Sequence, residues 1–170
     1  MTTSDPDRGR RPATDAEARA LASTFRLRIL RACLGEPHTN KEIAEALGKG
    51  PATVLHHVRT LVDTGFLEPQ PARRGTRGSR EIPYVATGKS WRMESPAKDS
   101  AMLSAFLEEV ALVPVEALDM MRAGLRLRPE RREELSRRFT ALVEEYFDDE
   151  DPDGEPWSVF LTIHPDPNRR

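Results

Sequence analysis

Two helix-start signals follow one another closely in the first half of this chain, and they limit the folds open to it. Thr39 and Glu42 have the spacing of a capping box, in which a hydroxyl and a carboxylate satisfy free backbone N–H groups at a helix start. Gly50 and Pro51 mark a second start, because proline fits the first helical position. The sequence therefore predicts a short helix, a tight turn and a second helix over residues 51–64.

The helix over residues 51–64 has one apolar and one polar face. The apolar side chains at helical spacing, expected to be buried, are Val54, Val58, Leu61 and Val62. His56 and His57 are adjacent, so their side chains diverge by about 100° around the helix. Such a pair is a poor chelate, and the sequence predicts no metal site.

The flanking segments complete a pattern. Thr14 and Glu17 form another capping box at the start of a helical region that we expect to break near Ser23. After Gly65 the period changes, and two extended segments around a Gly-containing tip predict a basic hairpin at 68–85. Its prolines confine these strands to sheet edges.

This order of helix, short helix, turn, helix and basic hairpin is that of a winged helix-turn-helix. The segments "ALASTFRLRIL", "TNKEIAEALGKGPATVLHHVRTLVDTGFLEP" and "YVAT" resemble the ArsR-type bacterial transcription regulators over residues 17–90, in particular their metal-free branch. The resemblance implies a homodimeric repressor that binds palindromic operator DNA near promoters.

A duplex offers base edges for specificity and phosphates for affinity, and each needs different side chains. Small and polar residues on the outer face of the second helix are expected to contact bases: Ala52, Thr53 and His56. Expected contacts to the DNA backbone are Thr39, Lys49, His57, Arg59, Arg73, Arg74, Arg77 and Arg80. For His57 the alternative is partial burial against the preceding helix. For the arginines the alternative is a solvated flexible hairpin.

The charge is divided unevenly along the chain. Residues 1–92 carry 16 Lys and Arg against 10 Asp and Glu, whereas residues 93–170 carry 10 against 18. The first half is therefore suited to approach a polyanion and the second is not. Two solvated surfaces of different composition are the plainer interpretation.

The second half is expected to pair two copies of the chain. A helix from Ser95 to about Leu112 presents apolar residues at a spacing of three and four, which predicts a dimer interface: Leu103, Phe106, Val110 and Val113. The alternative is that these apolar residues pack against other parts of the same chain. Dimerisation would set two recognition helices about one DNA turn apart.

Beyond this helix, the pattern predicts a small strand-helix-strand unit. Alternating apolar residues favour strands at 121–128 and 157–164, with a helix over 129–147 between them. The fold class is therefore α+β. The apolar residues Met120, Met121, Trp157 and Phe160 either line a pocket for an unknown small-molecule effector or form plain core.

Several classes are excluded or unsupported. Cys33 is the single cysteine and is expected to be a buried thiol. No nucleophile–base motif, P-loop or dinucleotide fingerprint is present, so we expect no enzyme and no cofactor. No apolar run is long enough for a membrane span, and the expected location is the cytoplasm.

The expected organisation is a disordered basic arm at 1–13, a winged helix-turn-helix at 14–92 and a dimerisation or effector domain at 93–170. The alternative function is a winged-helix module for protein interaction or dimerisation that binds no DNA.

Overall fold

The computed structural model describes residues 11–75, 78–94, 96–147 and 153–169. The chain divides into two compact units. One unit runs from Gly9 to Val113, and the other is formed mainly by the residues that follow.

The described residues of the first unit form five α-helices. They are α1 (Asp15–Leu21), α2 (Thr24–Ala32), α3 (Asn40–Ala46), α4 (Pro51–Asp63) and α5 (Pro96–Val110). Complete capping boxes are present at Thr14 for α1 and at Thr39 for α3. Ser23 caps α2, which confirms the expected break, and Gly50 with Pro51 begins α4. The local start signals therefore act as the sequence predicts.

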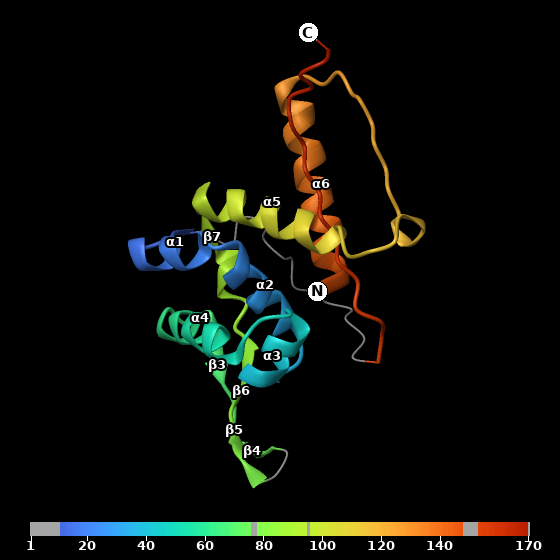
Figure 1. Cartoon of the computed structure of the whole chain (residues 1–170). Coiled ribbons are helices and arrows are strands. Elements are labelled where there is room, and N and C mark those ends of the chain that lie inside the picture. The colour runs from blue at the N-terminus through green and yellow to red at the C-terminus, as the bar shows by residue number, and fades with distance from the viewer. Residues whose placement is uncertain (1–10, 76–77, 95, 148–152, 170) are drawn as a thin grey trace. The chain divides into compact units, whose positions relative to one another are not determined.

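Short strands complete this unit (Figure 1). A three-stranded antiparallel sheet has the order β2 (His38–Thr39), β6 (Pro83–Ala86), β3 (Leu67–Pro69). Beyond it, β4 (Arg73–Arg74) pairs with β5 (Arg80–Glu81) to form the wing. The two long segments expected for the hairpin are thus each divided in two. Prolines in the first segment lack the N–H that a continuous ladder requires.

The segment expected to be the end of a disordered arm is partly ordered. Residues Arg11–Pro12 form β1, which pairs in parallel with β7 (Met93–Glu94). A short 3-10 helix, η2 (Lys89–Arg92), precedes β7. Residues 1–10 of the expected arm lie outside the described residues.

The core of the first unit contains the predicted face of α4. Val54, Val58 and Leu61 are fully buried, whereas Val62 is half-buried. Cys33 is also fully buried, as expected, and burial raises the pKa of its thiol to about 12. Removal of these side chains from water is the main force that fixes α4 against the other helices.

Helix α5 packs in this same unit, against α1 and α2. Its inner face buries Ala101 and Ala105. Arg28 of α2 forms an ion pair with Glu108 of α5 at 3.1 Å, and small residues let the two helices approach closely. The helix expected to mediate dimerisation is therefore also a structural part of the winged-helix unit.

The second unit contains a 3-10 helix, η3 (Val115–Ala117), and the long helix α6 (Pro129–Phe147). The prediction of this helix is confirmed, but the two flanking strands are wrong. Residues 121–128 and 157–164 form no strand, and their apolar residues other than the half-buried Phe160 are exposed, with Leu125 61% and Val159 75% exposed. Alternation specifies which face of a strand is apolar, but a strand also needs a ladder partner, and the described residues supply none.

The first unit has the arrangement of an α+β winged helix-turn-helix. Helices α3 and α4 follow one another across a tight turn, α2 packs on α4, and β3 and β6 lead into the wing (Figure 1). This confirms the fold class predicted for that part of the chain.

Candidate nucleic-acid interface

The turn between α3 and α4 is held at a fixed geometry. Gly48 has φ +61°, a left-handed conformation that glycine adopts without steric cost. The side-chain amide of Asn40 donates to the carbonyl of Pro51 at 2.9 Å, which ties the start of α3 to the first turn of α4. The orientation of α4 relative to α3 is therefore set by both turn and side chain.

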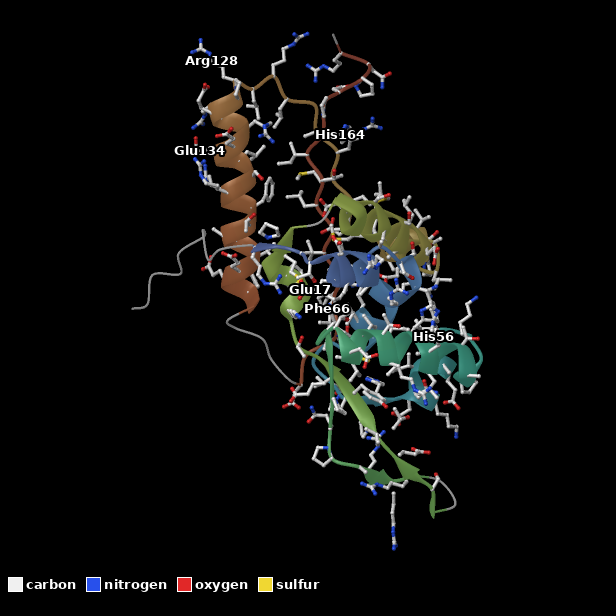
Figure 2. All side chains as sticks on the ribbon, turned by 90° about the vertical axis from the view of Figure 1, so that its left-hand side faces the viewer. Glu17, His56, Phe66, Arg128, Glu134 and His164 are labelled. Atoms are coloured by element: carbon white, nitrogen blue, oxygen red, sulfur yellow. The ribbon has the colours of Figure 1, made fainter. Side chains whose placement is uncertain are left out.

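The outer face of α4 is free of the core. Ala52, Thr53, His56 and Arg59 are all exposed, as the sequence predicts for residues opposite the buried stripe. Figure 2 labels His56 on this helix. A helix with small residues in its first turn and polar residues beyond it can approach a major groove closely.

His57 points in a different direction from His56. Its half-buried ring packs edge-on against Phe25 of α2, with 5.0 Å between centroids. Its Nδ1 lies 3.5 Å from Nη1 of Arg26. Burial, together with the nearby Arg26 and His56, lowers the pKa of His57. Of the two expected positions, the structure shows partial burial, against α2 rather than the helix immediately before.

The wing presents a basic surface. Arg74 and Arg80 lie opposite one another on β4 and β5, and both are exposed. Arg73 is half-exposed, and its Nη2 lies 2.5 Å from Oε1 of Glu42 on α3. Arg77 lies outside the described residues. An ion pair therefore joins the wing to the helix-turn-helix.

Two further residues expected to contact phosphates differ in accessibility. Lys49, between α3 and α4, is exposed. Thr39 is 2% exposed, and its Oγ1 accepts a hydrogen bond from the backbone N–H of Glu42. Its hydroxyl is therefore committed to the cap of α3.

A buried carboxylate that pattern analysis assigned only to a helix cap is the centre of a larger cluster. Glu17 is 6% exposed and accepts hydrogen bonds from both terminal nitrogens of Arg11, at 2.7 and 2.8 Å. Nζ of Lys89 lies 2.7 Å from Glu17 and 2.7 Å from the carbonyl of Thr64, at the end of α4. Arg11 and then Lys89 lower the pKa of Glu17 strongly.

The residues expected at a dimer interface lie on or just after α5 with unequal exposure. Leu103 is 47% and Val113 39% exposed, whereas Phe106 and Val110 are half-buried. Neighbouring Leu107 is 56% exposed. The outer face of α5 thus carries apolar side chains that the first unit does not cover completely.

The residues suggested for an effector pocket are not enclosed. Met121 is 81% and Trp157 82% exposed. A shallow open depression of about 460 Å³ lies instead between residues 125–128, Asp166 and Arg169. Its lining combines three arginines with Leu125 and Leu127.

Two other features are absent from the described residues. These residues contain no group of three or more His, Cys, Asp or Glu placed to hold a metal ion. None of the described helices is both long and apolar enough to cross a membrane.

Comparison with known proteins gives one family match. A model described as a helix-turn-helix domain matches residues 21–70, which span α2 to β3. No curated protein matches the chain.

Solved structures give weaker likenesses. Reduced HlyU from Vibrio cholerae is 18% identical, with 54% of this chain and 84% of that chain covered and a TM-score of 0.35. A mutant of Lactococcus lactis ZitR in its apo form is 26% identical, with coverages of 76% and 86% and a TM-score of 0.33.

A DNA complex of Staphylococcus aureus MepR is 17% identical, with coverages of 78% and 80% and a TM-score of 0.32. At such TM-scores these superpositions carry no argument about individual residues. The family match and the arrangement of α2, α3, α4 and the wing together show that the chain contains a helix-turn-helix domain within a winged-helix fold.

Proposed function

We propose that the chain is a homodimeric DNA-binding transcription repressor of the ArsR type, which reads a palindromic operator through residues 51–64 and the wing at 68–85. The observation that carries the proposal is the exposed outer face of α4 beside an arginine-rich wing in the same compact unit. A groove-reading helix and a phosphate-binding strand pair are the two parts that duplex recognition requires.

In this proposal the first turns of α4 contact base edges. Ala52 is small enough for close approach, and Thr53 offers both a hydroxyl and a methyl group. His56, one turn further along, offers a ring nitrogen that donates to guanine or accepts from an amino group. Each correct base contact of this kind discriminates by about 1–3 kcal/mol.

Phosphate contacts are assigned to cations around this helix. Lys49 and Arg59 flank the outer face of α4, and Arg74 and Arg80 are exposed on the wing. Arg73 and Arg77 complete the proposed set. Each phosphate neutralised contributes about 0.9 to the slope of log affinity against log salt concentration.

Dimerisation is assigned to the outer face of α5. The partly exposed apolar residues Leu103, Leu107 and Val113 support this assignment, because a partner helix would remove them from water. A two-fold dimer of this kind would set the two α4 helices about 34–36 Å apart, the spacing of successive major grooves.

Two further parts of the proposal concern the setting of the protein. A small-molecule effector bound by the second half would alter the separation of the two α4 helices, and no pocket is assigned to it. The proposed location is the cytoplasm, on the DNA that the protein regulates.

The test begins with DNA fragments that the purified full chain enriches from fragmented genomic DNA. The affinity of the variant Thr53→Ala/His56→Ala for an enriched fragment is expected to fall toward that for random DNA. The variant Arg74→Ala/Arg80→Ala is expected to bind enriched and random DNA more weakly. Its salt slope should be smaller by up to about 3.6, because the dimer loses four arginines.

Matched controls change the same residue types in the second unit. Thr140→Ala/His164→Ala and Arg122→Ala/Arg126→Ala alter exposed residues there and are expected to leave binding unchanged. If the Thr53/His56 variant keeps full sequence preference, the base-reading assignment is wrong. Absence of DNA binding by the wild type at low salt would favour the protein-interaction module instead.

A further inference from the structure

Helix α6 carries an apolar stripe that the described chain does not fully cover. Leu135, Phe139, Leu142 and Tyr146 recur at spacings of four, three and four, which places them along one side of the helix. Leu142 is 49% and Tyr146 72% exposed, whereas Leu135 and Phe139 are half-buried. No other helix or strand of the described residues packs extensively against α6.

The charges beside this stripe are divided along the helix. Arg138 lies next to the stripe toward the N-terminal end, and Glu145 lies next to it on the same side toward the C-terminal end. Arg138 is 77% exposed and only loosely paired with Glu134, at 4.0 Å (Figure 2 labels Glu134). Within the described residues Glu145 forms no ion pair.

We propose that α6 pairs antiparallel with α6 of a second copy of the chain. In the antiparallel register that places Phe139 against Leu142 of the second copy, Leu135 lies against Tyr146, and four apolar layers form about a two-fold axis. The same register sets Arg138 beside Glu145 of the second copy, and the two-fold axis repeats this pair. The stripe and the charges thus select the same register independently.

A second copy fits this face better than an unrelated partner does. The basic and acidic ends of the flank meet one another only when two such helices run in opposite directions. A parallel two-fold pair would set this flank against the opposite flank of the second helix, where Ser136 and Val143 are uncharged. A two-fold contact must be self-complementary. This flank meets that condition, because its cation Arg138 lies against the carboxylate Glu145 of the second copy. The inference rests on the homodimer in the proposed function and adds a second contact to it.

Charge reversal in the full chain tests this register. Arg138→Glu and Glu145→Arg each replace two attractive contacts by two repulsive ones, so the dimer dissociation constant measured by sedimentation equilibrium is expected to rise about tenfold. The double variant Arg138→Glu/Glu145→Arg restores both pairs in swapped form and is expected to return to the wild-type constant. Residues 138 and 145 are about 10.5 Å apart along one helix, so this rescue cannot arise within a single chain.

Matched controls are one residue away. Arg137→Glu and Glu144→Arg make the same charge changes on the side of α6 that points away from the stripe, and they are expected to leave the constant unchanged. Singles that weaken the dimer without rescue in the double variant would overturn the register. Singles that behave like the controls, or a monomeric wild type, would overturn the pairing itself.

Cross-linking tests the pairing of α6 even if contacts through α5 make the dimer dissociation constant too small to measure. Arg138→Cys/Glu145→Cys is expected to form a disulfide-linked dimer on mild oxidation, because the native Cys33 is buried and does not compete. Arg137→Cys/Glu144→Cys is the control pair, and equal yields from both pairs would contradict the proposal.

Operator binding separates this inference from the proposed function. If α6 does not pair, the wild type still dimerises through α5 and still binds its operator. If the proposed function is wrong, the wild type fails to bind any enriched fragment, whatever the cross-linking result.

Discussion

Nζ of Lys89 lies 2.7 Å from Oε1 of Glu17 and 2.7 Å from the carbonyl oxygen of Thr64. The same ammonium group lies 5.2 Å from the centre of the Phe66 ring, and Glu17 and Phe66 are labelled in Figure 2. One side chain therefore joins the start of α1 to the C-terminal end of α4, the proposed recognition helix. A cation at this end of a helix also interacts favourably with the helix dipole.

Removal of this cation should destabilise the first unit. Lys89→Met keeps the length of the side chain but removes the donor to the Thr64 carbonyl and one of the donors to the Glu17 carboxylate, which keeps Arg11. We expect the free energy of unfolding at neutral pH to fall by about 1–3 kcal/mol, the cost of leaving buried polar groups unsatisfied. Denaturant titration of the full chain measures it.

The control for this variant is Lys41→Met. Lys41 is 58% exposed and lies 3.9 Å from Glu45, a loose surface pair that should contribute little. An equal loss of stability in both variants would mean that the contacts of Lys89 are not what stabilises the unit.

The Glu17 carboxylate should make stability depend on acid pH. Arg11 and Lys89 hold its pKa well below the ordinary value of 4.5, so the unfolded state takes up a proton before the folded state does. The stabilisation is therefore fully present above pH 4.5 and is lost as pH falls below it. Glu17→Gln, which retains an acceptor for the cap, should be less stable than wild type at pH 7, with a difference that shrinks toward pH 3.

Denaturant titrations at several pH values measure this difference, with Glu45→Gln as the control. Glu45 is exposed on α3, and its substitution should change stability little at any of these pH values. A Glu17→Gln difference that stays constant between pH 7 and pH 3 would contradict the linkage.

His57 should add a second pH dependence in a higher range. Burial against α2, followed by the charges of Arg26 and His56, lowers its pKa below the ordinary value of 6.5. Because the unfolded state then binds the proton more readily, the folded state loses stability as pH falls through about 6.5. His57→Gln should flatten the stability profile between pH 7.5 and 5.5, as followed by thermal unfolding.

The neighbouring substitution His56→Gln provides the comparison. His56 is exposed on the outer face of α4, and its ring lies edge-on to that of His57 with 5.5 Å between centroids. The profile of that variant should stay closer to wild type than the profile of His57→Gln, because the buried imidazole is kept and only the smallest contribution to its pKa shift is removed. Equal flattening in both variants would contradict the assignment of this pH dependence to His57.

The sequence predicted correctly the features that depend on residues close together in the chain, and it failed where a feature depends on residues far apart. The starts of α1, α3 and α4 depend on residues three or four positions apart, such as Thr39 with Glu42, and each was predicted correctly. The strands at 121–128 and 157–164 depend on a partner distant in sequence, and alternation alone does not supply one. Local signals predict local structure, and ladder formation is not local.

The contacts of Lys89 were missed for the same reason. Its partners Glu17 and Thr64 are distant in the sequence, and a single lysine after a glycine forms no pattern. The capping box at the start of α1 already explained Glu17, so the sequence did not indicate that its carboxylate also pairs with Lys89. At the candidate interface, the exposed face of α4 could be predicted from the helical spacing of its apolar residues. The ion pair between Arg73 and Glu42 could not, because it joins two elements that only the folded structure brings together.

That pairing leads to a prediction about DNA affinity. Arg73, proposed to contact a phosphate, is engaged by the Glu42 carboxylate, so DNA binding must compete with an existing ion pair. Glu42→Gln removes the charge but keeps an acceptor for the cap of α3, because glutamine also completes a capping box. Release of Arg73 should raise the affinity and increase the salt slope by up to about 1.8, because the proposed dimer holds two copies of this arginine.

A matched variant separates release of Arg73 from a general change of charge. Glu45→Gln removes one carboxylate from the same helix without touching the wing, since Glu45 pairs loosely with Lys41 instead. Both variants gain from the weaker repulsion of DNA, but only Glu42→Gln frees an arginine, so only it should show the steeper salt dependence in fluorescence anisotropy titrations. A steeper slope in both variants would show that net charge, and not the contact between Arg73 and Glu42, controls the affinity. Adding Arg73→Ala to Glu42→Gln should abolish the gain in slope, because the cation released by the first substitution is then absent.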